Sequence, residues 1–198
     1  MREILRHSNI DLLREIEHLR NALQGVDSLI PTELDTYYHW VAAQFDAYHQ
    51  QVIQNLRDLG SSRDDILPEV LSNTQSVTRA LHLFNQRLVS PILRARPSDR
   101  LCLKLLRWLH LMHPQTQDIP VALSDGAFAS WPVPPWPTIY FMPPSAQQRL
   151  LYLPLFFHEF GHLLYASHKP EMDELVRGLQ ESISELLKPS VQRDDTHT

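Results

Sequence analysis

The sequence predicts a predominantly helical α+β fold, in which an N-terminal helical bundle over residues 1–113 precedes a mixed portion over residues 114–198. Apolar residues recur at helical spacing through the first portion. Nine of the 15 prolines lie between Pro114 and Pro154, which excludes long helices from most of that stretch. At 198 residues the chain suits one domain, or one domain with an appendage. We therefore expect the second portion to pack on the first, or to share a single domain with it.

Four helices are expected in the first portion. Asn9 is a suitable N-cap for the first of them. A second helix follows Pro31, a third runs over about 68–89, and a fourth runs over 99–110.

In two of these helices, the spacing of apolar residues indicates which face is buried. In the second, apolar positions are separated by three or four residues, which is typical of a seam packed lengthwise against other helices. The seam consists of Leu34, Tyr38, Val41, Phe45, Tyr48, Val52, Leu56 and Leu59. In the fourth helix the residues expected to face inward are Leu101, Leu105, Trp108, Leu109 and Met112.

Short strands are expected in the proline-rich stretch, at residues 119–123 and 138–142. Asp125-Gly126 can form a turn after the first strand. The segment Trp131–Pro137 indicates a proline-stiffened loop that covers apolar surface.

A helix is expected after this stretch. Ser145 can cap it, with Gln148 at the reciprocal position of a capping box. Pro154 falls inside the helical pattern, so it should either kink this helix or begin a fresh one.

Charge and cysteine content exclude several classes of protein. The net charge is −5 and basic residues do not cluster, so we expect no nucleic-acid partner. The single cysteine, Cys102, excludes an intrachain disulfide, a cysteine-rich zinc module and an iron–sulfur site, and it is expected to be buried. The sequence shows neither a signal peptide nor a membrane-spanning run, so we expect a cytoplasmic protein without a membrane partner.

The most informative motif lies in the apolar run over residues 155–165. His158 and His162 are four residues apart, so on a helix they share a face and both can reach one divalent ion at about 2.0–2.1 Å. Glu159 is placed to take a proton from a water that the ion holds. Apolar flanks predict that this helix is buried. The other histidines form no second metal-spaced pair, and we expect His110 and His113 at the surface.

The run His158-Glu159-Phe160-Gly161-His162 resembles the His-Glu-x-x-His motif of the zincin metallopeptidases. The resemblance covers roughly residues 119–187. It implies a Zn²⁺ cofactor, a peptide or protein substrate, and hydrolysis by metal-activated water that attacks an amide carbonyl. A non-peptide amide is an open alternative. The strand at 138–142 is similar to the zincin strand that pairs with an extended substrate.

The third protein ligand is open between several residues. The resemblance to glutamate-type zincins implies Glu181, with Glu185 orienting a histidine, after a turn at Lys169-Pro170 and an antiparallel return of the chain. Metzincins imply a histidine at the position of His168, although Tyr165 occupies the place of their glycine. Further candidates for the third ligand are Glu174 and a residue beyond position 198.

A non-catalytic protein is the alternative to an enzyme. In that interpretation the N-terminal helices recruit a protein partner, and the histidine motif is a structural or degenerate site.

Overall fold

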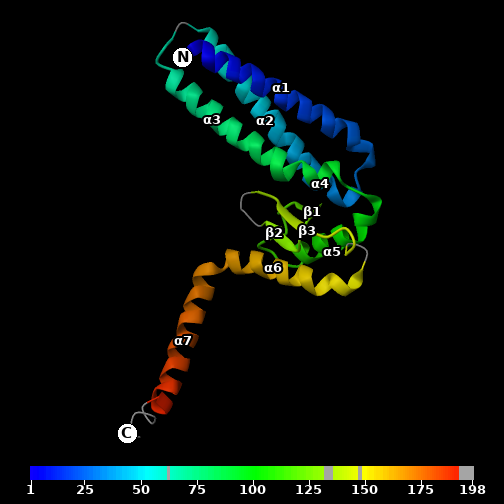
Figure 1. Cartoon of the computed structure of the whole chain (residues 1–198), viewed down its shortest axis with the longest axis vertical. Helices are drawn as coiled ribbons and strands as arrows, with labels where there is room; N and C mark the ends of the chain where they lie inside the picture. Colours follow the sequence, from blue (N-terminus) through cyan, green and yellow to red (C-terminus); the bar gives the residue numbers. More distant parts are fainter. Residues whose placement is uncertain (62, 132–135, 147–148, 192–198) are drawn as a thin grey trace. The chain divides into compact units, whose positions relative to one another are not determined.

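A computed structural model describes residues 1–61, 63–131, 136–146 and 149–191 (Figure 1). The chain divides into two compact units, Met1–Phe156 and Phe157–Thr198. The described residues are predominantly helical, with one small three-stranded sheet. The predicted fold class, mainly α within α+β, is therefore confirmed. None of the helices in the described ranges is both long and apolar enough to cross a bilayer.

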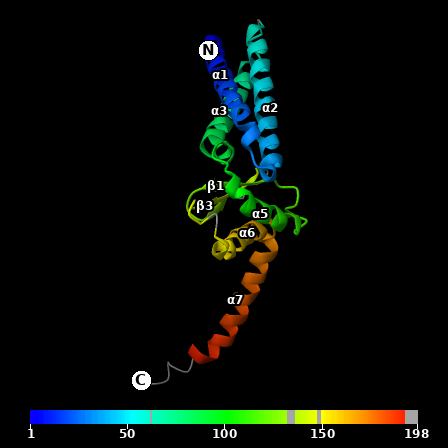
Figure 2. The ribbon, with the colours of Figure 1, turned by 90° about the vertical axis from the view of Figure 1, so that its right-hand side faces the viewer.

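Three long helices form the bundle of the first unit and run side by side in both views (Figures 1 and 2). They are α1 (Arg2–Val26), α2 (Asp35–Gly60) and α3 (Leu67–Leu83). The expected start of α2 after Pro31 is confirmed, with 3₁₀ turns at Asp27–Leu29 and Thr32–Leu34 leading into it. α3 has a proline in its first turn, where a missing N–H breaks no helical hydrogen bond.

The end of the third helix differs from the expected continuous segment over 68–89. A π-helical turn, η3 (Phe84–Leu88), follows α3 and leads into the short helix α4 (Ser90–Leu93). Both Phe84 and Leu88 are fully buried. The wider turn therefore carries two core side chains before Pro91.

Asn9 is not the N-cap of the first helix, because α1 already begins at Arg2 and Asn9 is fully buried. Its Nδ2 donates to Thr74 Oγ1 and to Leu5 O, both at 2.8 Å. Its Oδ1 accepts from Asn55 Nδ2 at 3.0 Å. One asparagine thus links α1, α2 and α3 through hydrogen bonds that compensate its burial.

Helix α5 (Arg100–Leu111) buries a different face from the one expected. It follows the short helix η4 (Pro97–Asp99), and it packs against β1. The buried residues are Cys102, Leu103, Leu106, Leu109 and His110. Of the residues expected to face inward, Leu109 is buried, whereas Leu101, Trp108 and Met112 are exposed. Arg100, Lys104 and Arg107 mark one polar side of this helix. The apolar residues span a wide arc away from that side, so the pattern alone does not select which part of the arc contacts the strand.

The sheet consists of β1 (Val121–Asp125), β2 (Ala129–Trp131) and β3 (Thr138–Met142) in the order β1-β3-β2. β3 matches its expected bounds and β1 begins two residues later than expected. β3 pairs in parallel with β1 and antiparallel with β2. β3 is therefore the central strand, and its expected role of pairing with a substrate is wrong, because neighbouring strands already occupy both of its edges.

β2 was not expected from the sequence, because it is only three half-buried residues long. It ends at Trp131, the first residue of the segment that was interpreted as a loop. Of that segment, residues 132–135 lie outside the described ranges. Trp136 packs edge-on against Trp40 and Phe84, with ring centroids 5.8 and 6.2 Å apart. This tryptophan covers apolar surface, as expected.

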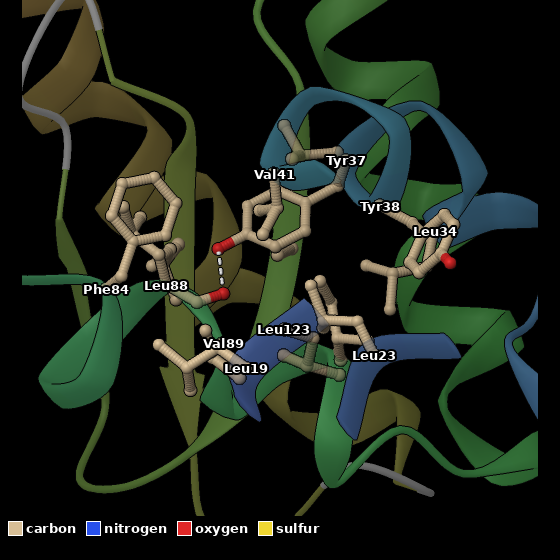
Figure 3. Packing of buried hydrophobic residues seen from close by; sticks show 14 of the residues in the cluster. Leu19, Leu23, Leu34, Tyr37, Tyr38, Val41, Phe84, Leu88, Val89 and Leu123 are labelled. Atoms are coloured by element: carbon tan, nitrogen blue, oxygen red, sulfur yellow. Dashed lines mark hydrogen bonds between the residues drawn. The ribbon is translucent and has the colours of Figure 1, made fainter. Parts of the chain in front are cut away.

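One hydrophobic core joins the bundle to the sheet (Figure 3). The residues that converge there include Leu19 and Leu23 of α1, Val41 of α2, Leu123 of β1, and Val89 between η3 and α4. Full burial of such side chains stabilises a fold by about 1.5–3 kcal/mol each. At its centre the Tyr37 hydroxyl donates to Leu88 O at 2.8 Å, so this buried phenol is satisfied.

His110 is buried rather than at the surface, which corrects the expectation for this residue. Its Nε2 lies 2.9 Å from Tyr140 Oη of β3, and its Nδ1 lies 3.3 Å from Thr116 O. The contact with Tyr140 connects α5 to the central strand, and the contact with Thr116 connects it to the turn that follows α5. Burial lowers the pKa of His110 to about 4, so the ring is neutral at physiological pH.

The C-terminal helices are α6 (Leu153–Ser167), preceded by the 3₁₀ turn η5 (Leu150–Tyr152), and α7 (Lys169–Val191). Ser145 lies in a turn, and Gln148 lies outside the described residues. Because α6 begins at Leu153, Pro154 falls in its first turn. Of the two expectations for this proline, the fresh helix is confirmed.

We predict that Asn9→Asp lowers the free energy of unfolding by roughly 3 kcal/mol, because it buries an unpaired charge against Leu5 O. An N-cap would tolerate this change, since aspartate caps helices as well as asparagine does. Urea unfolding followed by circular dichroism measures the loss. Asp11→Asn, at an exposed position of α1, is the control. A loss below about 0.5 kcal/mol would contradict the buried network.

We also predict that His110 makes stability depend on pH. The unfolded ring titrates near 6.5 and the folded ring near 4, so protons bind preferentially to the unfolded chain between these values. The contribution is complete above pH 6.5 and declines as the pH falls toward 4. The contribution of His110 to the free energy of unfolding falls by about 2 kcal/mol from pH 7.5 to pH 5.

Urea unfolding at both pH values tests this contribution. His110→Gln should reduce the difference by that amount, whereas His18→Gln, at an exposed position, should leave it unchanged. Equal pH dependence in wild type and His110→Gln would contradict the prediction.

Candidate metal centre

The motif helix α6 is amphipathic rather than wholly buried. Phe156, Phe160 and Leu163 are buried, at intervals of four and three residues. His158 and His162 are exposed. The expectation of a buried motif is therefore wrong for the two histidines, because the apolar residues around them divide between two sides of the helix.

The two imidazoles lie one above the other on the exposed side of α6. Their Nε2 atoms are 3.2 Å apart, their ring centroids 4.8 Å apart and their planes nearly perpendicular. Two nitrogens that each bind one tetrahedral zinc ion at about 2.0–2.1 Å stand about 3.3 Å apart. The observed separation of 3.2 Å is therefore compatible with shared coordination of a single ion.

The same two atoms also form a hydrogen bond, in which one ring donates its Nε2–H to the other. A metal ion needs the lone pairs of both Nε2 atoms, so it would replace this proton and its hydrogen bond. An exposed hydrogen bond of this kind contributes only about 0.5–1.5 kcal/mol. The loss of this hydrogen bond therefore opposes metal binding only weakly.

Glu159 completes the group. Its carboxylate and the imidazole nitrogens of His158 and His162 all lie within 4.8 Å of one another. Glu159 is half-buried, whereas both histidines are exposed. At this distance the carboxylate can act as a base beside the ion or bind the ion itself, so the three residues can supply two or three ligands.

The proposed third ligands lie elsewhere. In the ranges that the structure describes, the group capable of holding a metal contains neither Glu181, Glu174 nor His168. Glu181 and Glu174 are exposed on α7. His168 Nδ1 lies 3.1 Å from a carboxylate oxygen of Glu171. The assignment of Glu181 as a ligand stays a prediction.

The junction between α6 and α7 explains why Glu181 is not in the group. His168 alone separates the two helices, whereas an antiparallel helical hairpin needs a loop of about 2–5 residues. Within the unit Phe157–Thr198, α7 leads away from the last turns of α6 and does not return along them (Figure 1). Glu181 stands about 18 Å along α7 from Lys169.

A polar contact fixes this junction. The Tyr165 hydroxyl donates to Asp173 Oδ1 at 2.8 Å, and Lys169 Nζ donates to Asp173 Oδ2 at 3.1 Å. The hydrogen bond from Tyr165 lowers the pKa of Asp173 most, and the hydrogen bond from Lys169 lowers it further. Asp173 lies outside the His-Glu-x-x-His motif, and its role depends on the length of the junction, so the motif does not predict it.

Comparison of the chain with protein-family models, with curated proteins and with solved structures finds no match. The resemblance to zincins therefore rests on the motif residues and on the geometry of His158, Glu159 and His162.

Proposed function

We propose that this chain is a zinc-dependent hydrolase of the metallopeptidase type, in which His158 and His162 hold the ion and Glu159 is the base. The observation that carries the proposal is the 3.2 Å separation of the two Nε2 atoms with a carboxylate in the same group. The position of this group on the exposed side of α6 adds support, because a substrate has access to it.

Zinc is the ion that suits these ligands. Imidazole nitrogens bind zinc readily, whereas magnesium and calcium favour sites built from oxygen atoms. When bound, zinc would polarise a substrate carbonyl and lower the pKa of a water molecule to about 7.

Glu159 would move the proton. Its carboxylate accepts a proton from the attacking water and later donates it to the nitrogen of the leaving amine. Such general acid–base catalysis contributes about 10²–10⁴-fold to a rate. Phe157 is 47% exposed next to His158 and offers an apolar contact for a side chain of a peptide substrate.

We predict that protein supplied with zinc and then desalted retains close to one zinc per chain, measured by inductively coupled plasma mass spectrometry. His158→Ala and His162→Ala should lose the zinc, because each removes one of two neighbouring ligands. His18→Ala, an exposed histidine of α1, should retain it. Wild-type protein that is free of metal after this treatment would refute the site.

Glu159→Gln should retain zinc and lower hydrolysis of a fluorogenic peptide mixture about 10²–10⁴-fold. Glu69→Gln, an exposed glutamate of α3, is the control and should have wild-type activity. Loss of zinc from Glu159→Gln would instead identify Glu159 as a ligand.

The third ligand has its own test. If Glu181 binds the ion, Glu181→Gln should weaken zinc affinity, measured by competition with a chelator, while Glu174→Gln and His168→Ala should not. Wild-type affinity in all three variants would exclude these residues, and would leave Glu159 or water to complete a four-coordinate site.

A non-catalytic metal-binding protein is the second candidate function. It is favoured by the absence of Glu181, Glu174 and His168 from the described metal-binding group, since catalytic zinc sites normally have three protein ligands. Zinc bound by the two histidines without measurable hydrolysis of any peptide would support this candidate over the hydrolase.

A further inference from the structure

Helix α7 exposes a row of large apolar side chains. Every described side chain from Glu174 to Lys188 is exposed. The large apolar ones are Leu175 (61% exposed), Val176 (42%), Leu179 (57%), Ile183 (47%), Leu186 (77%) and Leu187 (55%). A helix in a protein gains most of its stability from packing of its apolar face. A 23-residue helix with this face in water therefore calls for a covering surface.

The spacing of the row identifies the kind of surface. Val176, Leu179, Ile183 and Leu186 follow one another at three, four and three residues, the repeat of a coiled-coil seam. In heptad terms Val176 and Ile183 occupy a positions, and Leu179 and Leu186 occupy d positions. β-branched residues at a positions, with leucine at d positions, favour a parallel coiled coil of two helices.

The residues beside the seam permit pairing of identical helices. From 175 to 187 the flanking e and g positions are Leu175, Gln180, Ser182 and Leu187. None of them is charged, so over residues 175–187 a second copy in parallel register meets no like charge across the seam. Leu175 and Leu187 widen the apolar contact on both sides of the seam.

The charged residues lie on the outer side of α7. Arg177, Glu181, Glu185 and Lys188 occupy b, c and f positions, which remain in water in a two-stranded coiled coil. Between Lys169 and Lys188 the helix has five acidic and three basic residues. This net negative charge disfavours binding of α7 to an anionic membrane surface. Amphipathic helices that bind such surfaces are rich in lysine and arginine.

We infer that α7 is a self-association surface, and that its occupant is the α7 of a second copy of this chain, paired in parallel through the four seam residues. The pairing buries the exposed apolar row of both copies at once. It uses no residue of the proposed metal site, so it is independent of zinc binding and of hydrolysis.

The oligomeric state tests this inference. In sedimentation equilibrium at micromolar concentrations, the full chain should have the mass of a dimer. Leu179→Asp combined with Ile183→Asp should give a monomer, because four carboxylates would meet inside the seam. Ser184→Asp, on the outer side of the same helix, should remain dimeric. Circular dichroism checks that the bundle stays folded in each variant. A monomeric wild type, or a dimer that survives the double substitution, would overturn the inference.

Cross-linking tests the parallel arrangement. In a Cys102→Ala background, Ile183→Cys should form a disulfide-linked dimer on mild oxidation, because a parallel seam places each a residue beside its own copy. Glu181→Cys, at an outer position, should remain monomeric on a non-reducing gel. A dimer by sedimentation that Ile183→Cys does not cross-link would overturn the parallel pairing. Binding of the wild-type monomer to vesicles of anionic lipid would identify a membrane as the occupant instead.

Discussion

The pitch of the α-helix is the constraint on which most of this structure depends. Side chains three or four residues apart lie on one face, and that relation builds the bundle of α1, α2 and α3. It also places His158 above His162 on α6, and it lines up the apolar row of α7. The same rule thus yields a core, a candidate metal centre and an unpaired surface, depending on which side chains occupy the shared face.

Polar groups inside the first unit connect elements that are distant in the sequence. Asn9 joins three helices, and His110 joins α5 to the central strand through Tyr140. Each group is buried with hydrogen-bond partners, which avoids the cost of an unsatisfied polar atom in an apolar interior. Networks of this kind favour one arrangement of helices and sheet, since a shift of any helix along its axis would leave several atoms unpaired.

The surroundings of the histidine pair bear on the chemistry proposed for it. Imidazoles in a buried site would need a partner to compensate desolvation, whereas His158 and His162 are exposed to water and carry no such cost. Burial therefore gives no indication that a metal is required. The fit of the Nε2 separation to zinc coordination, and the position of Glu159 in the same group, support the proposal instead.

The sequence alone determined the features that depend on residues close together in the chain. The positions of α2, α3 and β3, the burial of Cys102 and the start of a fresh helix near Pro154 follow from local spacing and from proline geometry. The pairing of His158 with His162 follows from the same helical spacing. Tertiary structure alone decided which face of α5 is buried, that β3 is the central strand, and that Asn9 and His110 lie in the core. It also decided that a one-residue junction keeps Glu181 out of the metal-binding group. These outcomes depend on contacts between distant segments, and a local pattern that permits several faces or turns does not choose among them.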